Sequence, residues 1–144
     1  MLMEWVEMEI NMSDQEMKPV DTAEIKAMLD QQRGRMKRYL SFCAHCSLCA
    51  DSCFLYTAHN KDPKYMPSYK VIQTLGKLYK KQGKVDHSFL TKIKGIAWRN
   101  CVLCGRCYCP IGINIPGMIA FVRSICRSQD VYPQLDESTS ESWL

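Results

Sequence analysis

The sequence lacks the features of a membrane-spanning, secreted or catalytic chain. No apolar run reaches the roughly 18–20 residues that cross a bilayer. The N-terminus is acidic and has neither the basic nor the apolar region of a secretory signal. No Gly-rich phosphate loop, acid–base pair, nucleophile constellation or convincing strand pair is present. We therefore expect a soluble, cytoplasmic chain in a reducing compartment, with no direct membrane span and no catalytic residues.

Cysteine, in contrast, is abundant, with nine residues in a chain of 144. Eight of them fall in two tight groups, C-x2-C-x2-C-x3-C at residues 43–53 and C-x2-C-x2-C-x-C-P at residues 101–110. A secreted disulfide scaffold spreads its cysteines along the chain, and the count here is odd, so we expect metal ligands. The ninth, Cys126, lies outside both groups beside apolar Ile125 and is expected to be a buried structural thiol.

Three cysteines at equal short spacing suit a cubane iron–sulfur cluster. Such a loop points three thiolates into one cluster while a fourth cysteine ligates the other cluster. By analogy with two-cluster ferredoxins, one [4Fe–4S] cluster is assigned to Cys43, Cys46, Cys49 and Cys109, and the other to Cys101, Cys104, Cys107 and Cys53. Zinc is the alternative, but its sites use two C-x2-C pairs or cysteine–histidine mixtures around one ion.

The second motif is two residues shorter than the first before its last cysteine. Three outcomes stay open. The short step from Cys107 to Cys109 still crosses between clusters, which we favour; Cys109 ligates and Cys107 is displaced; or one site is incomplete and holds a three-iron or non-cubane centre. His45, inside the first loop, is a further candidate ligand, although a surface or hydrogen-bonding role suits it better. Trp98 and Tyr108 flank the second motif and are expected to shield a cluster from water.

Apolar residues recur at helical spacing on both sides of the two motifs. The helices expected are residues 21–41 with Asp21 as N-cap and Glu24 as capping-box partner, residues 67–82 with Pro67 in the first turn and Gly83 at C′, a helix that starts at Asp86 as N-cap, and a last helix after Pro116. The order of helix, cysteine loop and helix occurs about twice, which suggests an internal repeat.

The domain organisation that we expect is one α-helical domain between two acidic ends. Residues 1–20 form a mobile acidic tail or partner-docking arm, residues 21–128 the domain, and residues 129–144 an acidic C-terminal tail. The net charge of +4 comes from a basic middle, residues 61–99. Such a segment is compatible with nucleic acid. However, its lysines also offset the negative charge of thiolate-bound clusters, so we expect no nucleic-acid partner.

Residues 35–133 resemble the two-cluster module of heterodisulfide-reductase-type proteins. These include the C subunit of heterodisulfide reductase, the N-terminal part of its D subunit, and the K subunit of the membrane complex that serves dissimilatory sulfite reductase. The resemblance is carried by residues 43–53, Asp62-Pro63, residues 67–70, residues 98–107 and the exit Cys109-Pro110-Ile111-Gly112-Ile113. It implies an all-α fold, an α-helical ferredoxin with two cysteine loops flanked by helices, similar to the cluster-bearing end of succinate dehydrogenase iron–sulfur subunits.

This resemblance also implies a function and partners. The chain is expected to be a non-catalytic electron-transfer subunit that passes single electrons through two [4Fe–4S] clusters. Its expected partners are a heterodisulfide-reductase-like subunit with a CCG domain, which this sequence lacks, and a flavoprotein or membrane cytochrome b subunit at the cytoplasmic face of a membrane. The alternatives are an essential small subunit of a disulfide- or trisulfide-reducing enzyme and a zinc-stabilised adaptor.

Overall fold

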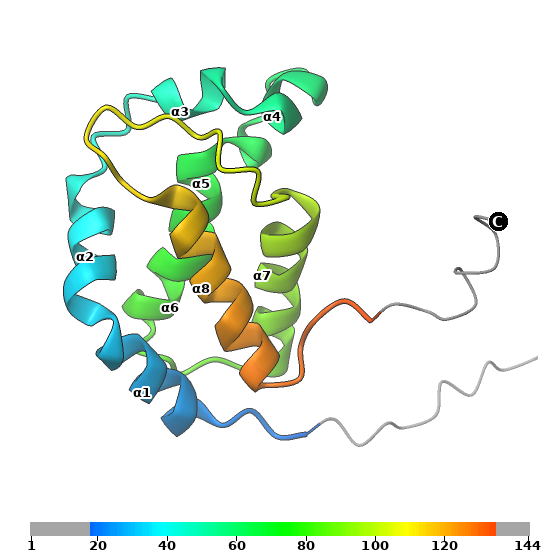
Figure 1. Ribbon diagram of the computed structural model, residues 1–144. Helices are drawn as coiled ribbons and strands as arrows, with labels where there is room; N and C mark the ends of the chain where they lie inside the picture. The colour runs from blue at the N-terminus through cyan, green and yellow to red at the C-terminus, as the bar shows by residue number, and fades with distance from the viewer. Residues whose placement is uncertain (1–17, 135–144) are drawn as a thin grey trace, which may run out of the picture.

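A computed structural model describes residues 18–134 of the 144-residue chain (Figure 1). Within this range the chain forms helices and connecting loops and has no strand, which confirms the all-α fold. None of the helices in this range has the length and hydropathy of a membrane span. Most of the expected N-terminal arm, residues 1–20, and the end of the expected C-terminal tail lie outside the described residues.

Both cysteine motifs lie at one end of a helical bundle (Figure 1). The helical segments of the described residues are α1 (Thr22–Gln31), α2 (Arg33–Phe42), α3 (Leu48–Asp51), α4 (Phe54–Ala58), η1 (Pro63–Tyr65), α5 (Pro67–Val71), η2 (Ile72–Gly76), α6 (Lys77–Lys80), α7 (His87–Arg99) and α8 (Ile115–Ser128). The first motif includes α3, and the second follows α7 as an irregular loop. We call this part of the molecule, residues 43–58 and 100–113, the cysteine end.

The bundle packs around α8, which crosses its middle (Figure 1). Asn114 caps this helix by accepting a hydrogen bond from the amide of Gly117 at 3.0 Å. The helix begins at Ile115, so Pro116 stands within its first turn and not before the helix, where the sequence led us to expect it. The helix buries one face against α7, α5, η2 and α1: Ile115, Met118, Ile119, Val122, Ile125 and Cys126. Each aliphatic side chain buried there contributes about 1.5–3 kcal/mol, so this face holds the surrounding helices together.

The helix expected over residues 21–41 is two helices, α1 and α2, which meet at Gln32. Asp21 caps α1 as expected, because its carboxylate accepts from the amide of Glu24 at 3.0 Å. The predicted capping box also requires the Glu24 side chain to accept from the backbone N–H of Asp21, and this part of the prediction is wrong. The side chain of Gln129 accepts from the amide of Asp21 at 2.7 Å, and its own amide donates to the Glu24 carboxylate at 2.9 Å.

Gln129 also shows that the packed part of the chain extends beyond residue 128. Gln129 and Val131 are each only 4 % exposed, although the acidic tail is expected from the sequence to begin at residue 129. The polar character of the segment does not prevent burial, because the Gln129 amide uses both its acceptor and its donor on α1. The structure therefore ties the end of α8 to the start of α1.

The helix expected over residues 67–82 is one rod made of α5, η2 and α6, in which η2 is a π-helical turn. The rod ends in a Schellman motif, with hydrogen bonds from Gln82 to Tyr79 and from Gly83 to Leu78, both at 3.1 Å. Gln82 therefore occupies the C′ position expected for Gly83, at φ 54°. Gly83 follows at φ 77°, where a Cβ would lie 3.1 Å from the backbone nitrogen of Lys26.

Candidate functional site

The two cysteine loops repeat the same backbone turn. In each loop, the residues on either side of the middle cysteine have a left-handed backbone: His45 (φ 52°), Ser47 (φ 65°), Leu103 (φ 56°) and Gly105 (φ 75°). This conformation costs about 1–2 kcal/mol for each residue other than glycine. Turns of this type direct successive backbone N–H groups into one concavity that attracts anions, as in many iron–sulfur sites. The shared strain thus indicates two related anion-binding loops.

The first cavity of the cysteine end lies between α2, α5 and the start of α8. Its sulfur ligands would come from both motifs, since the cysteines that line it are Cys43, Cys46, Cys49 and Cys109. The rest of the lining is largely apolar, with Leu40, Ile72 and Met118 among its residues. It contains no lysine, arginine, aspartate or glutamate. The donor set of four soft thiols in an apolar wall fits a metal–sulfur cluster.

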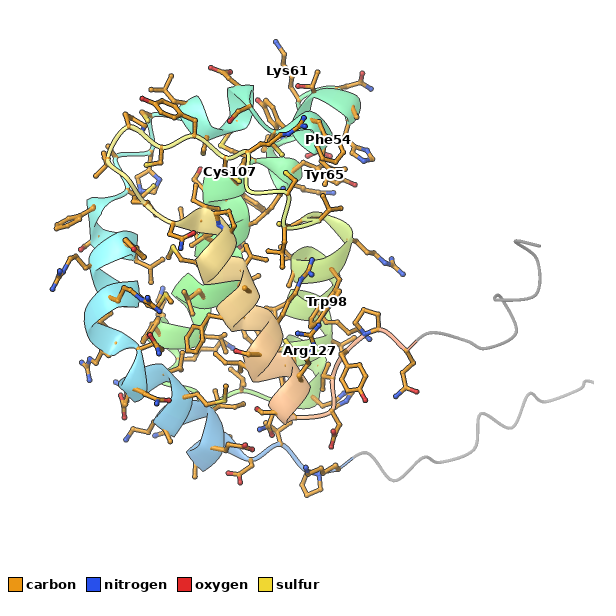
Figure 2. All side chains as sticks on the ribbon, viewed as in Figure 1. Phe54, Lys61, Tyr65, Trp98, Cys107 and Arg127 are labelled. Carbon is orange, nitrogen blue, oxygen red and sulfur yellow. The ribbon has the colours of Figure 1, made fainter. Side chains whose placement is uncertain are left out.

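The second cavity lies against α4, α5 and the start of α8. The cysteines that line it are Cys53, Cys101, Cys104 and Cys107. Phe54 and Leu55 form part of its wall, and Lys70 is its one charged lining residue. Cys107 and Phe54 lie together at this end of the molecule (Figure 2). The structure thus gathers the eight motif cysteines into two sets of four, while their assignment as ligands of particular clusters stays a prediction.

The short step from Cys107 to Cys109 has a simple geometric explanation. Between Cys49 and Cys53 the chain completes α3 at Asp51 and continues through an αR turn at Ser52, so these four steps advance by about 6 Å at the helical rise of about 1.5 Å each. Residues 107–109 form no helix, and two residues outside a helix advance by up to about 6.6 Å, the length of two strand residues. A C-x3-C that is mostly helical and a C-x-C outside any helix can therefore span a similar distance, and Cys107 and Cys109 line different cavities.

A single hydrogen bond joins the two motifs at this step. The backbone N–H of Tyr108 donates to the hydroxyl of Ser52 at 3.0 Å. The same hydroxyl donates to the carbonyl of Cys49 at 3.3 Å. Ser52 lies between cysteines of different cavities, and Tyr108 does so as well. This contact therefore fixes the register of the two crossing segments relative to each other.

The cysteines surround their cavities and do not meet at one point. Within residues 18–134, no three histidine, cysteine, aspartate or glutamate side chains are grouped to hold a single metal ion. A zinc ion requires its sulfurs at about 2.3 Å from one centre. Each cysteine of a cubane instead binds a different corner of the cluster. A spread set of four thiols is the arrangement that the larger cofactor requires.

Lys70 is a residue of the second cavity whose role the sequence analysis missed. It is only 2 % exposed, and its ammonium group donates to the sulfur of Cys53 at 3.7 Å. The carbonyl of Lys70 accepts from the hydroxyl of the buried Thr74 at 2.7 Å. In the sequence Lys70 is one lysine among many in the basic middle. It belongs to the segment 67–70 that carries the family resemblance, but its contact with the second cavity depends on its tertiary surroundings.

Several groups set the charge at the second cavity. Burial, and after it the neighbouring cysteines, raise the pKa of the Cys107 thiol to about 11, while Lys70 acts in the opposite direction. Metal binding must therefore displace a proton from this thiol. On the backbone side, the guanidinium of Arg123 donates to the carbonyls of Cys101 at 2.6 Å and Ala97 at 3.0 Å. Arg123 thus fixes the start of the second loop to the end of α7.

The remaining candidates have mixed outcomes. His45 is exposed at the rim of the first cavity, and Tyr108 lines that cavity. Trp98 lines neither cavity but lies between α7 and α8, with the guanidinium groups of Arg123 and Arg127 at 5.2 and 5.5 Å from its ring (Figure 2). Its expected shielding role is therefore wrong. Cys126 is fully buried as expected, and burial raises its pKa to about 12.

Comparison with known proteins identifies one matching family. Residues 39–113, just over half of the chain, match the family described as a 4Fe-4S dicluster domain. No curated protein and no solved structure matches the chain. The matched range begins at the end of α2, includes both cysteine motifs, and ends just before α8.

Proposed function

Because the chain belongs to the 4Fe-4S dicluster domain family, we propose that it relays single electrons through two [4Fe–4S] clusters within a heterodisulfide-reductase-like complex. An iron–sulfur electron-transfer role follows from the family. The observation that supports two clusters is the division of the eight motif cysteines between two cavities, four to each. Bound clusters would supply one-electron redox chemistry at both cavities.

The residues of this chain would hold and insulate the cofactors. The cysteines bind as thiolates, and the left-handed turns at His45, Ser47, Leu103 and Gly105 direct backbone N–H groups toward the bound anion. Apolar side chains such as Leu40 and Met118 exclude water from the first cavity. No group of this chain is required to move a proton or attack a substrate, which is consistent with a carrier role.

An exposed apolar collar surrounds the cavities and supports a partner at this end. Among residues 18–134, eight large hydrophobic residues are exposed, and six of them lie within two residues of a motif cysteine. These six, which we call the apolar collar, are Phe42, Leu48, Phe54, Val102, Tyr108 and Ile111. Apolar surface gathered in one region marks an interaction site. Electron transfer gains from such docking because it places the partner close to the cofactors.

We propose that the partner on the collar is a subunit with a CCG domain, where disulfide chemistry would occur. A flavoprotein or a membrane cytochrome b subunit would supply the electrons. Exposed cations in and beside the cysteine end, Arg106 within it and Lys61 three residues beyond its first segment, favour partners with acidic rims. The resemblance to heterodisulfide-reductase-type modules supports this choice of partners.

The carrier role is tested with the anaerobically reconstituted full chain. After reduction, it should transfer electrons to cytochrome c as a one-electron probe, yet reduce a low-molecular-weight disulfide no faster than buffer does. Disulfide turnover by the chain alone would contradict the carrier role and favour the alternative of an enzyme subunit.

The collar is tested by adding a CCG-domain catalytic subunit, which should allow the reduced chain to drive disulfide reduction. Val102→Glu in the collar should then slow this coupled reaction severalfold. Tyr132→Glu, at an exposed hydrophobic residue outside the cysteine end, is the matched control and should leave the rate unchanged. Equal rates for both variants would contradict docking at the collar.

A further inference from the structure

The two cavities differ sharply in their charge. The lining of the first contains no lysine or arginine, and its one histidine, His45, is exposed to solvent. The second has the ammonium of Lys70 in its wall, and the guanidinium of Arg123 holds the carbonyl of Cys101 from behind. The two loops repeat the same backbone turns, so this asymmetry comes from the helices that pack against them.

Lys70 is buried in a way that requires a negative partner. A buried ammonium group is strongly unfavourable unless a negative charge and hydrogen bonds compensate it. Its side chain donates to the sulfur of Cys53 at 3.7 Å, and no aspartate or glutamate lines the cavity. The negative charge that can compensate Lys70 is therefore that of the cysteine thiolates and the cofactor they bind.

The position of Lys70 is fixed by the π-helical turn that follows it. The hydroxyl of Thr74 donates to the carbonyl of Lys70 at 2.7 Å and to that of Val71 at 3.4 Å. Thr74 is fully buried in η2. π-Helical turns are rare and occur often at functional sites. This one begins two residues after Lys70: its Ile72 lines the first cavity, while its Thr74 holds the backbone of the lysine that lines the second.

We propose that Lys70 makes the cluster of the second cavity the easier of the two to reduce, so that the first electron taken up by the chain resides there. This inference rests on the proposed function. Uptake of one electron from a low-potential donor adds one negative charge to the cavity, while no bond forms or breaks and no proton moves. The ammonium of Lys70 stabilises that added charge, and its burial limits the screening of this attraction by solvent. The lining of the first cavity offers no buried lysine or arginine that could do the same.

The test is an anaerobic redox titration of the reconstituted full chain, followed by electron paramagnetic resonance. Lys70→Met removes the charge and keeps an unbranched side chain. This substitution should lower the reduced-to-oxidised ratio of the cluster in the second cavity at least tenfold at a fixed potential. For a one-electron couple, this corresponds to a fall of about 59 mV in the midpoint potential. The other cluster should keep its midpoint. Lys70→Arg should retain most of the wild-type separation, and Lys80→Met, at an exposed lysine of α6, should change neither midpoint.

A second measurement identifies the cluster concerned. Cys46→Ala disables the first cavity only, and the cluster that remains should titrate at the higher of the two wild-type midpoints. Remaining at the lower midpoint would overturn the inference. Unchanged midpoints in Lys70→Met, or equal shifts of both clusters, would overturn it as well.

Iron and sulfide analysis of the same samples separates the two proposals. Wild-type protein that holds no clusters would refute the proposed function. Loaded variants whose midpoints do not depend on Lys70 would refute only the role of this lysine.

Discussion

Replacing Ser52 by alanine tests whether one hydrogen bond aligns the two crossing cysteine segments. The hydroxyl accepts from the N–H of Tyr108 at 3.0 Å and donates to the carbonyl of Cys49 at 3.3 Å. Its loss removes the side-chain hydrogen bond that the described residues make to the step between Cys107 and Cys109. Both cavities should then open more often, because each takes one cysteine from this step.

The magnitude follows from the geometry of the contact. A typical hydrogen bond contributes about 0.5–1.5 kcal/mol net, which corresponds to roughly a two- to tenfold change in an equilibrium. Tyr108 is exposed, so water can replace the lost acceptor, and the effect should fall in the lower half of that range. The longer bond to Cys49 adds little.

The assay is the anaerobic rate at which a chelator removes iron, followed by the loss of visible absorbance. Ser52→Ala should lose iron about two- to fivefold faster than wild type. Ser52→Thr keeps the hydroxyl and should stay near the wild-type rate. Ser41→Ala removes a serine hydroxyl that bonds the carbonyl of Arg38 at 3.0 Å outside both cavities. The reasoning is refuted if Ser52→Ala matches wild type or if Ser41→Ala loses iron as fast.

Three further predictions concern stability, measured as the thermal unfolding midpoint of the loaded protein by circular dichroism. Gly83→Ala should destabilise the fold by at least about 1–2 kcal/mol, because an alanine there must adopt a positive φ and its Cβ comes too close to α1. Gly34→Ala, whose Cβ would meet no atom within 4 Å, should stabilise the fold by about 0.5–1 kcal/mol. Equal effects of the two substitutions would contradict the close packing at Gly83. Asp86→Ala should cost about 1 kcal/mol by removing the cap that accepts from the amide of Phe89 at 2.9 Å, and an unchanged midpoint would contradict that role. Because burial raises the pKa of Cys126 from 9.0 to about 12, its neutral thiol stabilises the fold below pH 9 and loses this contribution as the pH rises toward 12. Cys126→Ala should therefore show a shallower fall of the midpoint above pH 9, and an equally steep fall would exclude this thiol as a cause.

Local signals in the sequence are sufficient to predict most of the helix ends. Asp86, Asn114 and Pro67 act within three residues of the groups that they cap or start, so their roles can be inferred from spacing alone. The prediction of Asp86 as an N-cap is confirmed by the structure. The all-α fold is likewise predictable, because its apolar residues recur at helical spacing.

The features of the fold that the sequence does not predict depend on contacts between distant parts of the chain. Gln129 reaches Asp21 across 108 residues, and no local pattern indicates that this amide replaces Glu24 in the capping box. The break at Gln32 has no proline or glycine at that position to mark it. Tertiary packing therefore decides both features.

At the cysteine site, too, local spacing predicts some features, while others depend on contacts between distant parts of the chain. The spacing identifies eight candidate ligands, whereas the meaning of the short Cys107–Cys109 step depends on whether the backbone there is helical or extended. The role of Lys70 depends on burial, which only the packed rod of α5, η2 and α6 provides. Sequence spacing can indicate the chemistry of the donors, but not the charges that the fold brings beside them.

The most direct test of the central claim is anaerobic analysis of iron, acid-labile sulfide and zinc in the full chain. Two [4Fe–4S] clusters predict about eight iron and eight sulfide per chain, with no zinc. About four iron would contradict the two-cluster proposal and indicate one incomplete site. Zinc in place of iron, with no sulfide, would contradict the iron–sulfur assignment itself.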